Sequence, residues 1–179
     1  MKRVIVQSVA NDGMAVLNAA DPIVAKMAQD CPGSVIFFAT DRDHPVMAAH
    51  RALGKRVVYV EGDASICAEG GTRYRLPLAE VPITLGGAIG FQTENAMAAT
   101  AAAWALDIDW DVIRASMASF VNDTDRAPGR FNVFDYEGAT LIADYGHNPD
   151  AMLALVRAVD AMPAKRRSAA IRGAGHRHA

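Results

Sequence analysis

Residues 34–39 are Ser-Val-Ile-Phe-Phe-Ala, and they are followed by the polar residues 40–43 and then by His44-Pro45. A short apolar run rich in β-branched and aromatic residues is typical of a buried strand. A proline in the first turn favours a helix start, and Gly54 is a suitable residue to end that helix. The order strand, loop, helix is the repeating unit of an α/β fold.

Strand-like and helix-like segments continue to alternate on both sides of this stretch. Upstream, Asp21-Pro22 supplies an N-cap and a first-turn proline, while residues 2–9 fit either a strand or the end of a helix. The many small side chains between 91 and 106 predict a helix packed closely against a neighbour. The other predicted elements are an apolar run over 14–18, a helix over 21–29, strands over 57–60 and 73–78, the second in a local hairpin, and a helix over 110–120. The pattern predicts an α/β fold with mostly parallel strands.

A polar stretch at 122–129, which ends in Pro128-Gly129, separates two parts of the chain. It predicts a domain boundary, with a first domain over 1–127 and a second over 128–179. The second part is predicted to hold strands over 131–135 and 139–144, a helix over 149–162 and a strand over 168–172. So short a segment cannot form a sheet covered on both faces, and we expect it to be the start of a larger domain.

The composition limits the classes of function. The 179 residues include 18 Lys and Arg and 20 Asp and Glu, and a formal net charge of −2 gives no electrostatic reason to expect a nucleic-acid partner. Cys31 and Cys67 are too few for a disulfide framework, which favours a reducing, cytoplasmic setting. No apolar run reaches the roughly 18 to 20 residues of a membrane span, and residues 1–8 do not complete a signal peptide, so no membrane partner is expected.

The first candidate site is the glycine-rich turn Leu85-Gly86-Gly87-Ala88-Ile89-Gly90, which leads into a predicted helix. Backbone N–H groups at such a helix start attract anions. Asn95, in the first turn, could donate to and accept from a purine edge. The alternative is structural, with Thr93 and Asn95 satisfying only the N–H groups of the helix end.

The second candidate is Arg130, which follows Ala127-Pro128-Gly129. Pro-Gly favours a type II turn, which would hold the guanidinium in a fixed place to bind phosphate oxygens or a carboxylate. The alternative is an arginine on an exposed turn that binds nothing.

The third candidate is the loop between the predicted strand 139–144 and the helix that Asn148-Pro149 opens. Asp144 stands at the carboxyl end of the strand, where α/β sheets bind their ligands, and it could bind ribose hydroxyls or a metal ion. His147, in the same loop, could orient a substrate or a phosphate. The alternative is a loop whose polar side chains satisfy only its own backbone.

No metal site is expected, although Asp41 and Asp43 lie close in sequence to two histidines. His44 and His50 are six residues apart and point in different directions on a helix. No GxSxG, paired Cys–His or GxxxxGK[ST] motif occurs in the sequence. A basic tail is expected to be a solvated end, with Arg166, Arg167, His176, Arg177 and His178.

Four segments occur in an order and spacing that resembles the Mur ligase superfamily, whose members use ATP to join an amino acid to a carboxylate. They are Leu17-Asn18-Ala19-Ala20-Asp21-Pro22, Asn95 with Ala98-Ala99, Gly129-Arg130-Phe131, and Asp144-Tyr145-Gly146-His147-Asn148-Pro149. A closer resemblance is to the Mur-like C-terminal portion of the cyanophycin synthetases, and it extends to about Ala170. The segments that support it are Asp43-His44-Pro45 with His50-Arg51, and residues 90–99, 127–135 and 142–165.

The resemblance implies a fold and an activity. The first domain would be the C-terminal half of the Mur central, ATP-binding domain, and the second the truncated start of the Rossmann-like C-terminal lid domain. Such ligases phosphorylate a carboxylate with ATP and let an amine displace the phosphate. In cyanophycin synthesis, arginine is added in this way to the β-carboxyl groups of polyaspartate.

Roles for four residues follow from the resemblance alone. Asn95 would lie beside the adenine, Arg130 would reach the ATP phosphates, and Asp144 would lie near the ribose. Arg130 and His147 would be the catalytic residues. ATP and Mg²⁺ are the implied cofactors, with the metal ligands mostly in an upstream segment. The implied partners are ATP, arginine and the cyanophycin polymer, and a homo-oligomer is left open.

The family's phosphate loop has no counterpart in this sequence, and the tail after Gly173 departs from the family pattern. We therefore expect a fragment with half an ATP site and little or no ligase activity by itself. The alternatives are a non-catalytic nucleotide-binding or docking module, and part of another Mur-type ligase from peptidoglycan or folate metabolism. Gln92, where those relatives often have histidine, favours the cyanophycin synthetase resemblance.

Overall fold

The computed structural model describes residues 3–171 of the chain, which forms two compact units, Met1–Phe120 and Val121–Ala179. The predicted assignment of 1–127 and 128–179 to two Mur domains stays a prediction. The predicted tail residues His176, Arg177 and His178 lie outside the described residues.

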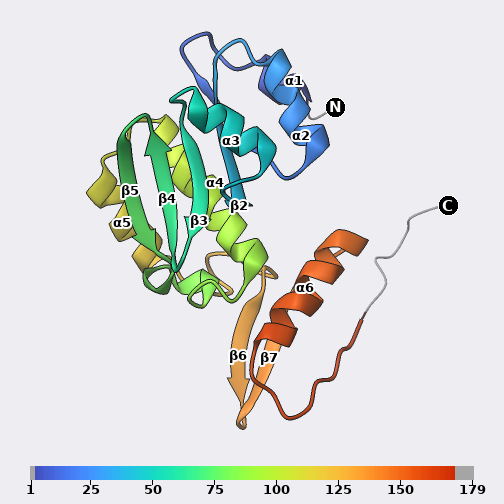
Figure 1. The fold of residues 1–179 in the computed structure, drawn as a ribbon. Coiled ribbons are helices and arrows are strands. Elements are labelled where there is room, and N and C mark those ends of the chain that lie inside the picture. The colour runs from blue at the N-terminus through green and yellow to red at the C-terminus, as the bar shows by residue number, and fades with distance from the viewer. Residues whose placement is uncertain (1–2, 172–179) are drawn as a thin grey trace, which may run out of the picture. The chain divides into compact units, whose positions relative to one another are not determined.

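A five-stranded sheet is the framework of the first unit, with the strand order β1-β2-β3-β4-β5 (Figure 1). The strands are β1 (Met14–Asn18), β2 (Ser34–Asp41), β3 (Val57–Glu61), β4 (Ala64–Glu69) and β5 (Thr72–Pro77). The first three strands are parallel, as predicted, but β4 and β5 are antiparallel to their neighbours, so the expectation of mostly parallel strands was too strong. The reason is local, because the two residues Gly62 and Asp63 between β3 and β4 can join only antiparallel strands.

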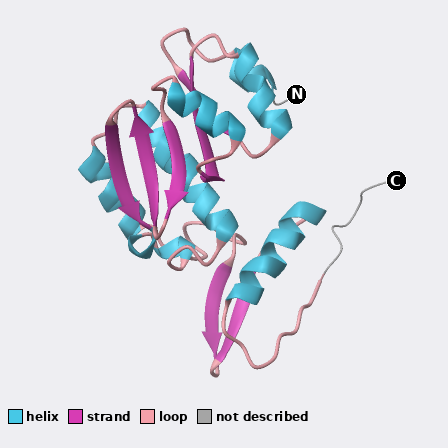
Figure 2. Cartoon of the chain, viewed as in Figure 1, coloured by secondary structure: helices cyan, strands magenta, loops and turns pink. Residues whose placement is uncertain are grey.

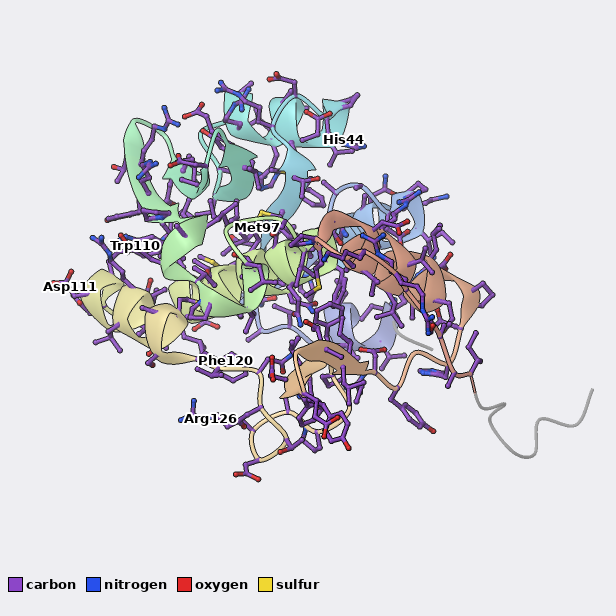
Figure 3. All side chains as sticks on the ribbon, turned by 90° about the horizontal axis from the view of Figure 1, so that it is seen from below. His44, Met97, Trp110, Asp111, Phe120 and Arg126 are labelled. Carbon is purple, nitrogen blue, oxygen red and sulfur yellow. The ribbon has the colours of Figure 1, made fainter. Side chains whose placement is uncertain are left out.

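Helices cover both faces of this sheet. One face packs against α1 (Arg3–Gln7), α2 (Pro22–Lys26), the 3-10 helix η1 (Met27–Asp30) and α3 (Pro45–Ala52), and the other against α4 (Gly90–Ala105) and α5 (Trp110–Ser119). Successive residues of β2 alternate, with Phe37 on the first face and Ile36 and Phe38 on the second. Met97 of α4 is fully buried in the second face (Figure 3). The small side chain of Ala101, also fully buried, fits the close packing predicted for this helix.

Two predictions near the N-terminus are now decided. The ambiguous segment 2–9 holds a helix, α1, whose Val6 is buried in the core. The helix predicted over 21–29 begins as expected, with Oδ1 of Asp21 accepting hydrogen bonds from the N–H groups of Ile23 and Val24. It changes to the 3-10 helix η1 after Lys26. Two further 3-10 helices, η2 (Leu78–Glu80) and η3 (Pro82–Thr84), connect β5 to the glycine-rich turn.

The described residues of the second unit, 121–171, form a hairpin that is followed by a helix (Figure 2). Strands β6 (Asn132–Tyr136) and β7 (Ala139–Ala143) are antiparallel, and α6 (Pro149–Ala161) follows. The strand predicted over 168–172 is wrong for its described residues, 168–171, which are not in a strand. Instead, the Arg167 guanidinium folds back and donates hydrogen bonds to the carbonyls of Val159, Asp160 and Met162 at the end of α6. No helix within residues 3–171 combines the length and apolarity needed to cross a membrane.

Candidate functional site

Two hydrogen bonds join the turn that contains Arg130 to the end of β7. The Phe131 N–H donates to Oδ2 of Asp144 at 2.9 Å, and the Tyr145 N–H donates to the Gly129 carbonyl at 2.8 Å. The two bonds run in opposite directions, so each segment both donates and accepts. The sequence segments that contain Arg130 and Asp144 are therefore held side by side within the second unit.

Asn132 fixes the same turn from inside. Its side chain, 1% exposed, accepts a hydrogen bond from the Gly129 N–H at 2.7 Å. Its amide nitrogen donates to the carbonyls of Asn122 and Ala127 at 3.1 and 3.0 Å. One buried amide thus forms hydrogen bonds with three backbone groups of the same segment. Sequence reasoning missed Asn132, because nothing in the local pattern distinguishes it from an ordinary polar residue at a strand start.

Arg130 lies on a turn of the predicted kind. Gly129, the third residue of the turn, has φ of 67°, and the Arg130 N–H donates to the Ala127 carbonyl at 3.3 Å. The side chain of Arg130 is exposed, and its guanidinium forms no ion pair with another described residue. A guanidinium held at a fixed turn and left without a counter-charge is suited to bind a phosphate or a carboxylate.

Asp144 and His147 lie in the loop between β7 and α6. Asp144 is half-buried, and Oδ2 is occupied by the Phe131 N–H. His147 is exposed, with its ring 5.7 Å from the ring of Tyr145 and Nδ1 3.3 Å from the Tyr145 carbonyl oxygen. Asn148 caps α6 by accepting from the Ala151 N–H at 2.8 Å. Some polar side chains of the loop therefore contact its own backbone, while the His147 ring stays accessible to solvent.

Asn95 belongs to the first unit, on the exposed side of α4. Its amide nitrogen donates to Oε1 of Gln92 at 3.1 Å, and it caps no helix-end N–H. Thr93 donates instead to the Ile89 carbonyl at 3.2 Å. The structural alternative considered for these two residues, capping of the helix start, is therefore wrong. Burial raises the pKa of Glu94 above its usual range.

Several N–H groups of the glycine-rich turn are already paired within the turn. The N–H of Gly87 donates to both oxygens of Thr84, and those of Ala88 and Ile89 donate to the carbonyls of Leu85 and Thr84. Leu85, Gly86 and Gly87 all have positive φ, so the turn closes on itself. These three amides are therefore not available to an anion.

Two of the four side chains considered for a metal, Asp43 and His50, have other partners, whereas Nδ1 of His44 is buried without a hydrogen-bond partner among the described residues. Asp43 pairs with Arg42 and Arg51, and Nε2 of His50 lies 2.8 Å from the Val35 carbonyl oxygen. Burial lowers the pKa of His50, Lys55 lowers it further, and the hydrogen bond to Val35 opposes both effects. Within residues 3–171, no group of three or more His, Cys, Asp or Glu side chains could hold a metal ion.

Two recesses on the first unit contain none of the predicted site residues. One borders Lys26 and His44 near the ends of β1 and β2. The other lies beside Arg56, Tyr74 and Trp110, where Trp110 stands at the start of α5 (Figure 3). The second is filled in part by the Arg56 guanidinium, which stacks 4.7 Å from the Trp104 ring centroid.

Comparisons with known proteins agree with the resemblance drawn from the motifs. Residues 129–178 match the family model described as Mur ligase, glutamate ligase domain. The chain is 40% identical over 157 residues to a cyanophycin synthetase of Geminocystis herdmanii and 39% identical over 151 residues to one of Synechocystis sp.. These alignments cover 87% and 83% of the chain but 18% and 17% of the relatives. The predicted resemblance is confirmed. The chain spans less than a fifth of the length of these longer proteins.

Two further matches bear on the wider family and on the fold. The chain is 31% identical over 152 residues to a UDP-N-acetylmuramate--L-alanine ligase of Xylella fastidiosa, which covers 82% of the chain and 29% of that protein. A pseudomurein peptide ligase type C from Methanothermus fervidus superposes with a TM-score of 0.51 at 23% identity, over 85% of the chain and 35% of that structure. The structural likeness supports the α/β fold that the sequence predicted.

Proposed function

We propose that this chain is a portion of an ATP-dependent ligase of the cyanophycin synthetase type, which forms C–N bonds between an amino acid and a carboxylate. The support is the similarity of most of the chain to one part of those enzymes. Since the chain spans less than a fifth of their length, the activity and the substrates of the whole protein belong to the proposal.

The proposed reaction has two steps. A carboxylate oxygen attacks the γ-phosphorus of ATP, which breaks the bond to the β-phosphate oxygen and releases ADP. The amine of the incoming amino acid then attacks the acyl-phosphate carbon, forms the C–N bond, expels phosphate and loses a proton to solvent. Positioning and charge stabilisation supply most of the rate enhancement in such phosphoryl transfers.

The observation that supports this function best is the pair of hydrogen bonds between the Arg130 turn and the end of β7. It gives Arg130 and Asp144 fixed positions within one unit, as binding of charged and hydroxylated parts of a nucleotide requires. We assign the phosphates to Arg130, the ribose to Asp144 and the adenine to Asn95. His147 is assigned a role in orienting the substrate or the phosphate.

The proposal includes a set of partners and a compartment. Arginine and a polyaspartate-based polymer are the proposed substrates besides ATP, and Mg²⁺ would be held mostly by groups of an upstream segment. Cys31 and Cys67 are both free thiols, which suits a reducing, cytoplasmic setting. Burial raises the pKa of Cys67 to about 12, so this thiol is unreactive.

Nucleotide binding by the full chain tests the proposal. Titration of the isotope-labelled protein with ATP, followed by NMR, is expected to shift the amide signals of Phe131 and Tyr145, because these N–H groups fix the turn and the strand end. The substitution Arg130→Ala is expected to weaken ATP binding about tenfold or more, since it removes a charge-assisted contact. Arg157→Ala, which removes an exposed arginine from α6, is the matched control.

Two outcomes would overturn parts of this proposal. Equal ATP affinity in the Arg130→Ala and Arg157→Ala variants would remove Arg130 from the site. No shift at millimolar ATP would remove nucleotide binding altogether. A separate assay of ATP- and arginine-dependent phosphate release is expected to show none from this chain by itself, and release would contradict the expectation that it holds only part of the active site.

A further inference from the structure

A recess of about 370 Å³ on the first unit is lined by aromatic rings and carboxylates. It lies where the residue before β3, the start of β5 and the loop between α4 and α5 meet. We call it the aromatic recess, after its three rings, Tyr74, Trp104 and Trp110. Since Trp104 is in the last turn of α4, the recess is about 14 Å along that helix from Asn95.

The three aromatic side chains of the recess pack together. The ring centroids of Tyr74 and Trp110 are 4.5 Å apart, and the Trp104 centroid lies 6.3 Å from the first and 6.5 Å from the second. Tyr74 and Trp110 are half-buried, and Trp110 stands at the start of α5 (Figure 3). The faces of such rings attract cations, and tryptophan does so most strongly. The aromatic recess is therefore suited to a flat group with a positive charge.

One guanidinium of the chain itself already occupies part of the recess. The Arg56 guanidinium lies 4.7 Å from the Trp104 ring centroid. Its Nε donates to Oε2 of Glu69 at 3.1 Å, and its Nη2 lies 3.4 Å from Oδ1 of Asp107. A ring face and two carboxylates thus hold one flat cation here, which shows the kind of group that these side chains fit.

The carboxylates of the recess outnumber its cations. Glu69, Asp107 and Asp109 line it, and Arg56 is the one cation among the described residues that do. Oδ1 of Asp109 accepts the Asp111 N–H at 2.9 Å. Within residues 3–171, no hydrogen bond reaches Oε1 of Glu69 or Oδ2 of Asp107 and Asp109. Three acceptor oxygens and an excess of negative charge therefore remain for a second cation.

We propose that the aromatic recess is a binding site for the guanidinium group of an arginine residue in the polyaspartate-based polymer. The identity of the polymer rests on the proposed function, whereas the preference for a guanidinium rests on the recess alone. A guanidinium is planar and directs its N–H donors outward, so it can stack on a ring and contact two carboxylates at once. An ammonium group is a point charge that cannot stack, and the urea group of citrulline has no charge for the rings and carboxylates to attract.

Such a site would act on a polymer that already carries arginine. Each added arginine presents one guanidinium, and a bound one would tether the polymer to the enzyme. The tether would raise the effective concentration of the reacting end without contributing to the chemical step.

The test uses the two tryptophans of the chain, because both line the aromatic recess. Their indole N–H signals are followed by NMR while the full chain is titrated with N-acetyl-arginine, N-acetyl-lysine or N-acetyl-citrulline. Each probe has an acylated α-amino group and a free α-carboxylate, as an arginine joined through its amine has. N-acetyl-arginine is expected to shift both signals and to bind about threefold more tightly than N-acetyl-lysine. N-acetyl-citrulline is expected to shift neither.

Asp107→Asn removes one charge from the recess with little change of shape. Asp107 has φ of 52°, a left-handed conformation that asparagine also adopts, so the fold is expected to be unchanged. The variant is expected to bind N-acetyl-arginine about threefold more weakly, as the loss of an exposed ion pair gives. Asp111→Asn is the matched control, because Asp111 is exposed on α5 but does not line the recess. It is expected to bind as tightly as the unsubstituted chain.

A fragment of the polymer and free arginine separate two sources of the guanidinium. The fragment is a triaspartate with arginine on each β-carboxyl group. It is expected to bind about threefold more tightly than N-acetyl-arginine, because it offers three guanidinium groups to one recess. Free arginine that binds more tightly than the fragment would overturn the assignment to the polymer and would assign the recess to the incoming amino acid.

Each remaining result decides one statement. The absence of an indole shift at high millimolar N-acetyl-arginine overturns the site, and equal affinities for N-acetyl-arginine and N-acetyl-lysine overturn the preference for a guanidinium. Equal affinities of the Asp107→Asn and Asp111→Asn variants overturn the contact with Asp107. Guanidinium binding by a chain that does not bind ATP overturns the proposed function, and the polymer with it, but keeps the recess. ATP binding by a chain that binds no guanidinium overturns this inference alone.

Discussion

The carboxylate of Asp144 accepts a hydrogen bond from the backbone N–H of Phe131 at 2.9 Å, across 13 positions of the chain. Phe131 has φ of 55°, in the left-handed region that residues with a Cβ adopt at a cost. The hydrogen bond helps to hold this unfavourable conformation next to Arg130. Asp144 is therefore a structural acceptor as well as a candidate ligand-binding group.

Removal of the Asp144 carboxylate is expected to loosen the turn. Asp144→Ala leaves the Phe131 N–H without its acceptor, at a cost of about 1 to 3 kcal/mol. Hydrogen exchange of the Phe131 amide, followed by NMR, is expected to accelerate accordingly. Asp144→Asn keeps an acceptor oxygen and is expected to preserve most of the protection. Unchanged exchange in Asp144→Ala would show that this bond does not stabilise the turn.

Asn132→Ala is expected to destabilise the second unit by about 2 to 3 kcal/mol, because it removes three hydrogen bonds to the backbone, although the Ala127 carbonyl keeps the Arg130 N–H. Asn95→Ala removes an exposed asparagine with one side-chain hydrogen bond and is expected to cost about 0.5 kcal/mol or less. Urea denaturation, read from signals of each unit, compares the two. Similar losses of unfolding free energy in the two variants would mean that the hydrogen bonds of Asn132 contribute little to stability.

Stability of the first unit is expected to fall as the pH drops below about 6.5, the ordinary pKa of histidine. Burial lowers the pKa of His50, so the unfolded chain takes up a proton before the folded chain does. Stability is complete above the unfolded pKa and decreases toward the lower folded pKa. Thermal unfolding at several pH values measures how the stability of the first unit depends on pH. His50→Gln, which can still donate to the Val35 carbonyl, is expected to flatten the dependence, and an unchanged slope would assign it to other groups.

A positive charge alone cannot replace the contacts of Arg56. Its guanidinium, 16% exposed, lies over the Trp104 ring and donates to the Trp104 carbonyl and to Glu69. Arg56→Lys is expected to cost about 1 to 2 kcal/mol and to change tryptophan fluorescence, because an ammonium group cannot stack and make both contacts. Arg114→Lys, at an exposed pair with Glu80, is the control and is expected to cost less than about 1 kcal/mol. Equal losses of unfolding free energy in the two variants would argue against a contribution from stacking of Arg56 on Trp104.

Local sequence signals predicted the segments whose structure depends on neighbours along the chain. The helix predicted over 91–106 is α4, Gly90–Ala105, and the strand predicted over 34–39 lies within β2, Ser34–Asp41. Strand β4 was not predicted, since Ala64-Ser65-Ile66-Cys67-Ala68-Glu69 has several residues with weak strand preference. It is a strand because β3 and β5 pair with it on both sides.

The strand predicted over 168–172 shows the opposite error. Its composition suits a strand, but the sheet of the second unit consists of β6 and β7 in the described residues. A strand needs a neighbour that supplies hydrogen-bond partners, and the local pattern does not say whether one is present.

For the candidate site, the sequence by itself determined the motif segments, the turn at Pro128-Gly129 and the helix start at Asn148-Pro149. These features depend on the conformational preferences of a few adjacent residues. Only the tertiary structure decided that Asp144 accepts from Phe131 and that Asn132 forms hydrogen bonds with three backbone groups. Such contacts join residues that are distant in sequence, and they exist only when the intervening chain has folded to bring the atoms within hydrogen-bonding or van der Waals distance.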